Sequence, residues 1–181
     1  MILLNRRKLL VGDFMIKAIV YNSNTGHTEE YAKILSEKIN VPYYDIKTIR
    51  KELRQNDEII YLGWICASRI CGINKVTKKY KVKCCGAVGA YAFDEKYIQE
   101  IKKGNKLEIP LFYLRGGINY KKLKGIKKKV FQMFGNAMEK ENRPENRELI
   151  NLLKNGGNYV SEKNLEQLIT YIMEELEREI S

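Results

Sequence analysis

A hydroxyl-rich loop decides how the rest of this chain is interpreted: Ser23-Asn24-Thr25-Gly26-His27-Thr28. A short apolar run at residues 17–21 precedes it, and helical periodicity begins at Glu29. A strand that turns directly into a helix leaves the first amide groups of the helix unpaired, and these groups suit a phosphate dianion. The residues alone also allow a second interpretation, in which the Ser and Thr side chains only cap the helix.

Apolar runs and helical segments alternate along the rest of the chain. The strands are expected at residues 17–21, 43–47, 58–66, 83–91 and 107–114. The third run is almost continuously apolar, as in a central parallel strand that is covered on both faces. The alternation predicts an α/β fold with a doubly wound, five-stranded parallel sheet and helices on both faces. Ligands of such sheets bind beyond the carboxyl ends of the strands.

Composition and charge narrow the class of partner. The chain has 181 residues, with 33 Lys and Arg against 22 Asp and Glu, which gives a net charge of +11. This length suits one domain. The positive charge favours an acidic protein, an anionic membrane surface, nucleic acid or a negatively charged substrate, without choosing among them.

Several kinds of chemistry are disfavoured by what the sequence lacks. It has neither a GxxxxGK[ST] loop nor a GxGxxG fingerprint, which argues against a nucleoside triphosphatase or a dinucleotide-binding domain. A mechanism with two imidazoles is excluded because His27 is the only histidine. The cysteines form no CxxC pair, so we expect reduced thiols and no metal; they are Cys66, Cys71, Cys84 and Cys85.

The first 14 residues are expected to form an arm outside the domain, which would span residues 15–181. Their apolar runs are too short for a signal peptide or a membrane span. Met15 stands just before the first strand. Two interpretations are open: the natural protein starts at Met15, or the arm is a genuine basic surface segment.

A basic segment at about residues 118–140 follows the last predicted strand. Its lysines are accompanied by no acid before Glu139. One helical stripe carries its apolar residues: Leu123, Ile126, Val130, Met133 or Phe134, and Ala137. The stripe could pack the helix on the domain, or it could meet a membrane surface or an acidic partner.

The first strand and its loop closely resemble the phosphate loop of the flavodoxin family, S/T-x-T-G-x-T, at every specified position. The resemblance implies the strand order 2-1-3-4-5 and a non-covalently bound FMN as the cofactor. It implies that the phosphate binds at Ser23, Asn24, Thr25, Gly26, His27 and Thr28. The flavin would carry the electrons, and no catalytic side chain is implied.

The resemblance also implies two loops that border the flavin ring. One follows the third strand, at Ile65, Cys66, Ala67, Ser68 and Arg69. The other follows the fourth strand, at Val88, Gly89, Ala90 and Tyr91. Tyr91 either stacks on the flavin or packs its ring on the core. Trp64 is expected in the core, because it belongs to the third strand.

Residues 111–117 and the basic segment after them are similar to a narrower group, the flavodoxin-domain proteins related to bacterial menaquinone-dependent protoporphyrinogen dehydrogenase. Flavodoxins are usually acidic, and this chain departs from them in being basic. The similarity implies contact with a substrate or partner at Arg115, Lys127, Lys128 and Lys129.

Three functions follow as expectations. The first is a cytoplasmic, FMN-binding redox protein that exchanges electrons with a partner protein, which is expected to be acidic. The second is an FMN-dependent protoporphyrinogen or quinone oxidoreductase at the inner face of the membrane. The third is a basic binding module without enzymatic activity that uses its charge on nucleic acid, and the absence of a nucleic-acid motif disfavours this function.

Overall fold

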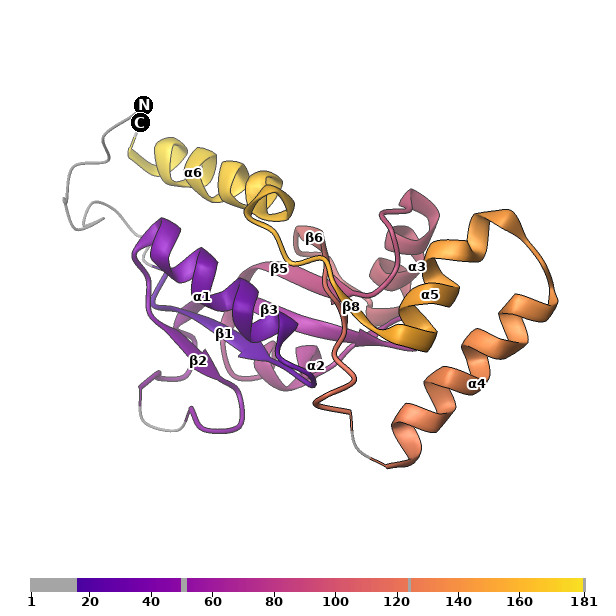
Figure 1. Ribbon diagram of the computed structural model, residues 1–181. Helices are drawn as coiled ribbons and strands as arrows, with labels where there is room; N and C mark the ends of the chain where they lie inside the picture. The colour runs from indigo at the N-terminus through magenta and orange to yellow at the C-terminus, as the bar shows by residue number, and fades with distance from the viewer. Residues whose placement is uncertain (1–15, 50–51, 124, 181) are drawn as a thin grey trace.

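The computed structural model describes residues 16–49, 52–123 and 125–180 (Figure 1). The expected arm at residues 1–14 lies outside this part. Within it, the chain folds as an α/β structure around one main parallel sheet.

The main sheet contains five parallel strands in the order β2 (Tyr43–Asp45), β1 (Ala18–Asn22), β3 (Glu58–Cys66), β5 (Lys81–Gly89) and β6 (Leu111–Arg115). This is the predicted order 2-1-3-4-5 when only the parallel strands are counted. The sheet differs from the prediction by one strand, since β4 (Arg69–Ile70) pairs antiparallel with the end of β3 and makes the sheet six-stranded. A strand of two residues is too short to show any periodicity in sequence.

Helices cover both faces of the sheet, as the alternation predicts. On one face lie α1 (His27–Ile39) and the closing segment η2 (Glu162–Leu165) and α6 (Glu166–Ile180), which share one apolar cluster with the sheet. On the other face, α2 (Ile73–Val76) and α3 (Glu95–Asn105) contribute Val76 and Ile101 to a second cluster. Tyr31, Leu35 and Leu168 are fully buried in the first cluster.

The last parallel strand begins later than its apolar run. Residues 107–114 were expected to be extended, but β6 starts at Leu111. Lys106 is the C-cap of α3 in the left-handed conformation, and the Leu107 N–H donates to the Lys102 carbonyl. Leu107 therefore belongs to the end of the helix, which hydrophobicity alone does not distinguish from the start of a strand.

A helical insertion follows β6. It contains α4 (Ile126–Lys140), η1 (Pro144–Asn146) and α5 (Arg147–Asn155). A two-stranded antiparallel sheet of β7 (Gly117–Ile118) and β8 (Gly157–Asn158) closes its two ends. Figure 1 shows α4 and α5 at the end of the molecule toward which the parallel strands point.

Leu123, the first residue of the apolar stripe, is buried before α4 begins, but the part of the stripe within α4 is exposed, so the interpretation in which this part packs on the domain is wrong. Ile126 is 80% exposed, Met133 69% and Phe134 60%. Contact with α5 is made by another side of the helix, where Phe131 and Met138 join the small core beneath the insertion. In the described ranges, no helix is both long and apolar enough to cross a membrane.

Candidate functional site

The three predicted loops meet at one cavity of about 470 Å³. They follow β1, β3 and β5, whose carboxyl ends lie at the same edge of the parallel sheet. The first loop contributes Ser23, Asn24, Thr25, His27 and Thr28. The second contributes Ile65, Cys66, Ala67 and Ser68, and the third Val88, Gly89, Ala90 and Tyr91. The volume is in the range of pockets that hold a cofactor or other small molecule.

The first loop combines free amides with hydroxyl groups at the start of α1. Gly26 is the N-cap of the helix with φ +106°, and it makes no side-chain cap hydrogen bond to the first turn. The first backbone bond of the helix runs from Glu30 N–H to the Gly26 carbonyl, so the amides of residues 27–29 precede the helical ladder. Ser23 Oγ accepts from the Gly26 N–H at 3.0 Å, which leaves the hydroxyl proton of Ser23 available to a ligand.

The second loop is a tight hairpin turn held from below by α3. Ala67 and Ser68 have φ +46° and +59°, the left-handed pair that a two-residue hairpin needs. The Asn105 side chain accepts from Ile70 N–H at 2.9 Å and donates to the Ser68 carbonyl at 2.9 Å. Arg69 also donates to the Gly104 carbonyl. These bonds hold the hairpin at the cavity edge.

The third loop rests on a cluster of three tyrosines. The Tyr113 hydroxyl donates to the Tyr91 carbonyl at 2.7 Å. The Tyr97 ring lies between the other two, with centroids 5.3 Å from Tyr91 and 6.2 Å from Tyr113. Tyr91 is 49% exposed and lines the cavity, so its ring is not packed in the core. The structure therefore places an accessible aromatic ring at the cavity wall.

The insertion forms an apolar roof over the cavity. Its contributing residues are Ile118, Leu123, Val130, Phe131, Phe134, Met138, Leu149 and Leu153. An ion pair between Lys154 and Glu139 at 2.8 Å links α5 to α4. The cavity thus has a polar end at the first loop and an apolar body between the sheet and the roof.

His27 sits at the polar end and is only 7% exposed. Burial lowers the pKa of its imidazole, Glu30 opposes this effect, and the nearby Lys122 ammonium lowers the pKa further. Its Nδ1 lies 3.3 Å from Thr25 Oγ1. The histidine therefore favours its neutral form, with one ring nitrogen facing a hydroxyl of the same loop.

Some predicted residues lie elsewhere. Gly26 lines a neighbouring cavity of about 650 Å³, and Arg69 lies among the residues of another depression beside α3. Arg115 pairs with Glu148 at 2.6 Å, and its guanidinium lies 3.8 Å from the centroid of the Tyr159 ring. It therefore links β6 to the insertion and to the segment after β8.

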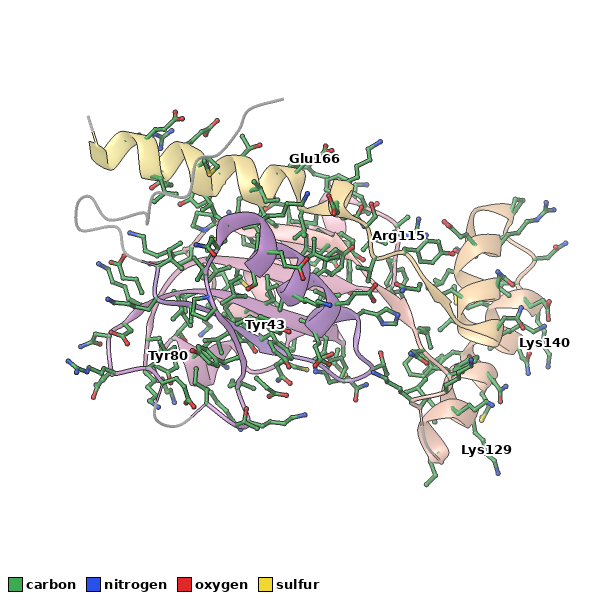
Figure 2. The ribbon with its side chains drawn as sticks, turned by 60° about the vertical axis from the view of Figure 1, so that its left-hand side comes forward. Tyr43, Tyr80, Arg115, Lys129, Lys140 and Glu166 are labelled. Carbon is green, nitrogen blue, oxygen red and sulfur yellow. The ribbon has the colours of Figure 1, made fainter. Side chains whose placement is uncertain are left out.

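The predicted lysine contacts lie on α4, at the end of the molecule beyond the sheet. Lys128 and Lys129 are exposed on this helix, and Figure 2 shows Lys129 and Lys140 there. Lys127 belongs to the same helix, but its side chain is outside the described part.

Sequence reasoning missed three contributions to the cavity. Trp64 was expected in the core, yet it is only half-buried and lines the cavity, because it is close to the end of β3. Tyr97 of α3 also lines it. The leucines at helical spacing around residue 150 indicate an apolar face on α5. The sequence does not show that this face lies over the cavity.

The thiols give no sign of a metal site or a disulfide. All four cysteines are free, and burial raises the pKa of Cys84 to about 12. Cys66 is exposed and lines the cavity. Across the described residues, no three His, Cys, Asp or Glu side chains form a group that could hold a metal ion.

Comparison with known proteins adds no family. No protein-family model matches the chain, and no curated protein matches it.

Proposed function

We propose that this protein is a flavodoxin-like redox protein that binds FMN at the cavity and transfers electrons through it. The main support is the convergence of the loops after β1, β3 and β5. These strands end at Asn22, Cys66 and Gly89, and yet their loops line one cavity. The strand order is compatible with that fold.

The residues present fit the two ends of FMN. At the polar end, free amides of the first turn of α1 and the hydroxyls of Ser23 and Thr25 suit the phosphate. The apolar body between Trp64, Tyr91 and the roof suits a flat heteroaromatic ring. Burial and the Lys122 ammonium lower the pKa of His27, which favours a neutral imidazole at the polar end of the cavity.

When bound, the flavin supplies the redox chemistry, taking up electrons from a donor and passing them to an acceptor. The chain's own residues bind and orient it. The α1 amides hold the phosphate end, the Asn105-supported hairpin limits the cavity at β3, and the tyrosine cluster fixes the third loop. Phe131 and Met138 of the roof exclude water from the apolar body. No side-chain acid or base is required.

The direct test is to purify the protein and titrate the apoprotein with FMN. Binding should quench flavin fluorescence and give the two absorption bands of oxidised flavin in the protein fraction. Tryptophan emission should fall as well, since Trp64 is the only tryptophan and lines the cavity. Colourless protein that leaves the fluorescence of added FMN unchanged would contradict the proposal and favour a basic binding module.

A second candidate function is supported by the roof and by the lysines beside it. Exposed Val130 and Phe134 line the cavity, and Lys128 and Lys129 lie on the same helix. An apolar substrate such as a quinone, or an acidic porphyrin, could reach the apolar body from this side. We therefore propose a protoporphyrinogen or quinone oxidoreductase as the alternative to a simple electron carrier.

Anaerobic mixing of chemically reduced protein with a quinone distinguishes the two. Fast reoxidation that slows when Lys127, Lys128 and Lys129 are changed together to Gln would favour the enzyme. Reoxidation that the triple change leaves unaltered would favour the carrier.

A further inference from the structure

A short turn from the insertion approaches the first loop. Residues 119–123 form the first part of the connection from β7 to α4. The amides of Lys122 and Leu123 both donate to the Asn119 carbonyl at 3.1 Å. Leu123, one of the roof residues, is 7% exposed, and Ile118 on the other side of the turn is paired with Gly157. The backbone of Lys122 is thus held at both ends.

The side chain of Lys122 extends from this turn to the first loop. A Cβ built on Gly26 would lie 2.8 Å from the Lys122 Nζ, so the ammonium group sits directly against the loop backbone. Both residues line the neighbouring cavity, which adjoins the flavin cavity because Thr25, His27 and Ile118 line both. Nearly one hundred residues separate Lys122 from Gly26 in sequence, so only the fold brings them together.

The charges at the start of α1 explain why the position of Lys122 matters for an anionic ligand. The first turn of α1 carries Glu29 and Glu30, which repel an anion at the helix start. Of the cations that line the neighbouring cavity, Lys33 is one turn further along α1 and Lys121 shares the turn with Lys122. Among these three lysines, and within the described residues, only the Lys122 ammonium lies against Gly26 of the first loop.

We propose that Lys122 is the counter-ion of the bound phosphate and makes the site specific for phosphorylated flavin. The inference rests on the proposed FMN function and adds a residue that lies far outside the loop motif. A phosphate held by the α1 amides is within a few ångström of Gly26 and therefore within reach of this ammonium group. The positive charge of Lys122 offsets the negative charges of Glu29 and Glu30 in the first turn of α1. A phosphate dianion can therefore bind where the local charge would otherwise be negative.

The test compares FMN with riboflavin, which has the same ring but no phosphate. Lys122→Gln should raise the Kd for FMN roughly tenfold, the size expected for one hydrogen bond to a charged group. The Kd for riboflavin should stay within about twofold. Lys140→Gln is the matched control: it removes the same charge from the exposed last turn of α4 and should leave both constants nearly unchanged. Raising the salt concentration should weaken FMN binding more in the wild type than in the Lys122→Gln protein.

A second readout needs no flavin. His27 is the only histidine, so its imidazole signals can be followed alone by NMR in the apoprotein. Removing the Lys122 ammonium should raise the pKa of His27, and Lys140→Gln should not.

The outcomes separate the two proposals. If the wild type binds FMN and Lys122→Gln binds it equally well, the role of Lys122 is overturned and the FMN function stands. If the two flavins lose affinity equally, Lys122 acts on folding or on the ring, and the counter-ion role is again overturned. If the wild type binds neither flavin, the proposed function fails, and this inference fails with it.

Discussion

Gly135 of α4 lies against Leu153 of α5 so closely that a Cβ on the glycine would come 3.2 Å from the leucine Cβ. The same position would lie 2.8 Å from Lys154 Cγ. Leu153 lines the cavity from its roof. The absence of a side chain at Gly135 therefore sets how closely α4 can approach the rest of the roof.

Replacing Gly135 by Leu should separate the two helices and open the roof. We expect a loss of about 1–3 kcal/mol in the free energy of unfolding, the usual cost of overpacking. FMN and riboflavin should lose affinity by similar factors, because the roof lies over the apolar body of the cavity. Ala137→Leu, on an exposed side of the same helix, is the control. An unfolding curve and flavin affinities equal to those of the control would show that the helices do not depend on this contact.

The combined change Thr25→Val and Thr28→Val should weaken FMN binding about tenfold or more and riboflavin binding much less. The substitutions keep the shape of each side chain and remove two hydroxyls that line the polar end of the cavity. Fluorescence titration with both flavins measures the difference. Equal losses for the two ligands would place the phosphate somewhere other than this loop.

Gly89→Ala should destabilise the third loop through Tyr113. A Cβ on Gly89 would lie 2.5 Å from the Tyr113 hydroxyl, which donates to the Tyr91 carbonyl. We expect the free energy of unfolding to fall by about 1–3 kcal/mol. Adding Tyr113→Leu makes room for the methyl group, so the double variant should lose less than the sum of the two single changes. Additive losses in thermal or urea unfolding would rule out a clash between these two residues.

The pH dependence of stability should carry the signature of His27. Burial lowers the folded-state pKa of this group below its unfolded value of about 6.5, so the unfolded chain binds the proton more readily. The free energy of unfolding should therefore fall as the pH is lowered from about 6.5 toward the folded-state pKa.

The comparison with His27→Gln isolates this contribution. Glu30 and Lys122, which also act on the imidazole, are retained in both proteins. The difference in stability between wild type and variant should rise with pH across that window and be constant above it. Parallel profiles over the whole window would mean that the imidazole has the same pKa in both states.

The parts of the site that follow strand ends could be predicted, because parallel strands bring their carboxyl ends to one edge. Thr25, Ser68 and Tyr91 were placed in one site from the motif and the strand pattern, and they line one cavity. Whether that cavity holds FMN stays a prediction. The short β4 and the β7–β8 pair gave no usable signal, since two residues carry no period and depend on partners such as Asn105 and Gly157.

The roof could not be placed from sequence for a different reason. The stripe through Ile126 and Phe134 has helical spacing, but spacing does not say which of two apolar sides meets the domain. Gly135 decides this, because it permits close contact on the side that also carries Phe131 and Met138. Lys122 likewise contacts Gly26 only through the fold.

The pairing of β7 with β8 determines how the helical insertion could be replaced. Gly117 lies beside Asn158, so the chain enters and leaves the insertion at neighbouring points, and residues 119–156 form a detour between them. A short turn in place of those residues would keep the order of the parallel strands while removing the roof and Lys122 together. The insertion could therefore be exchanged as one unit, in evolution or by design. Such an exchange would change which ligands enter the cavity, without altering the parallel strands whose loops form its other walls.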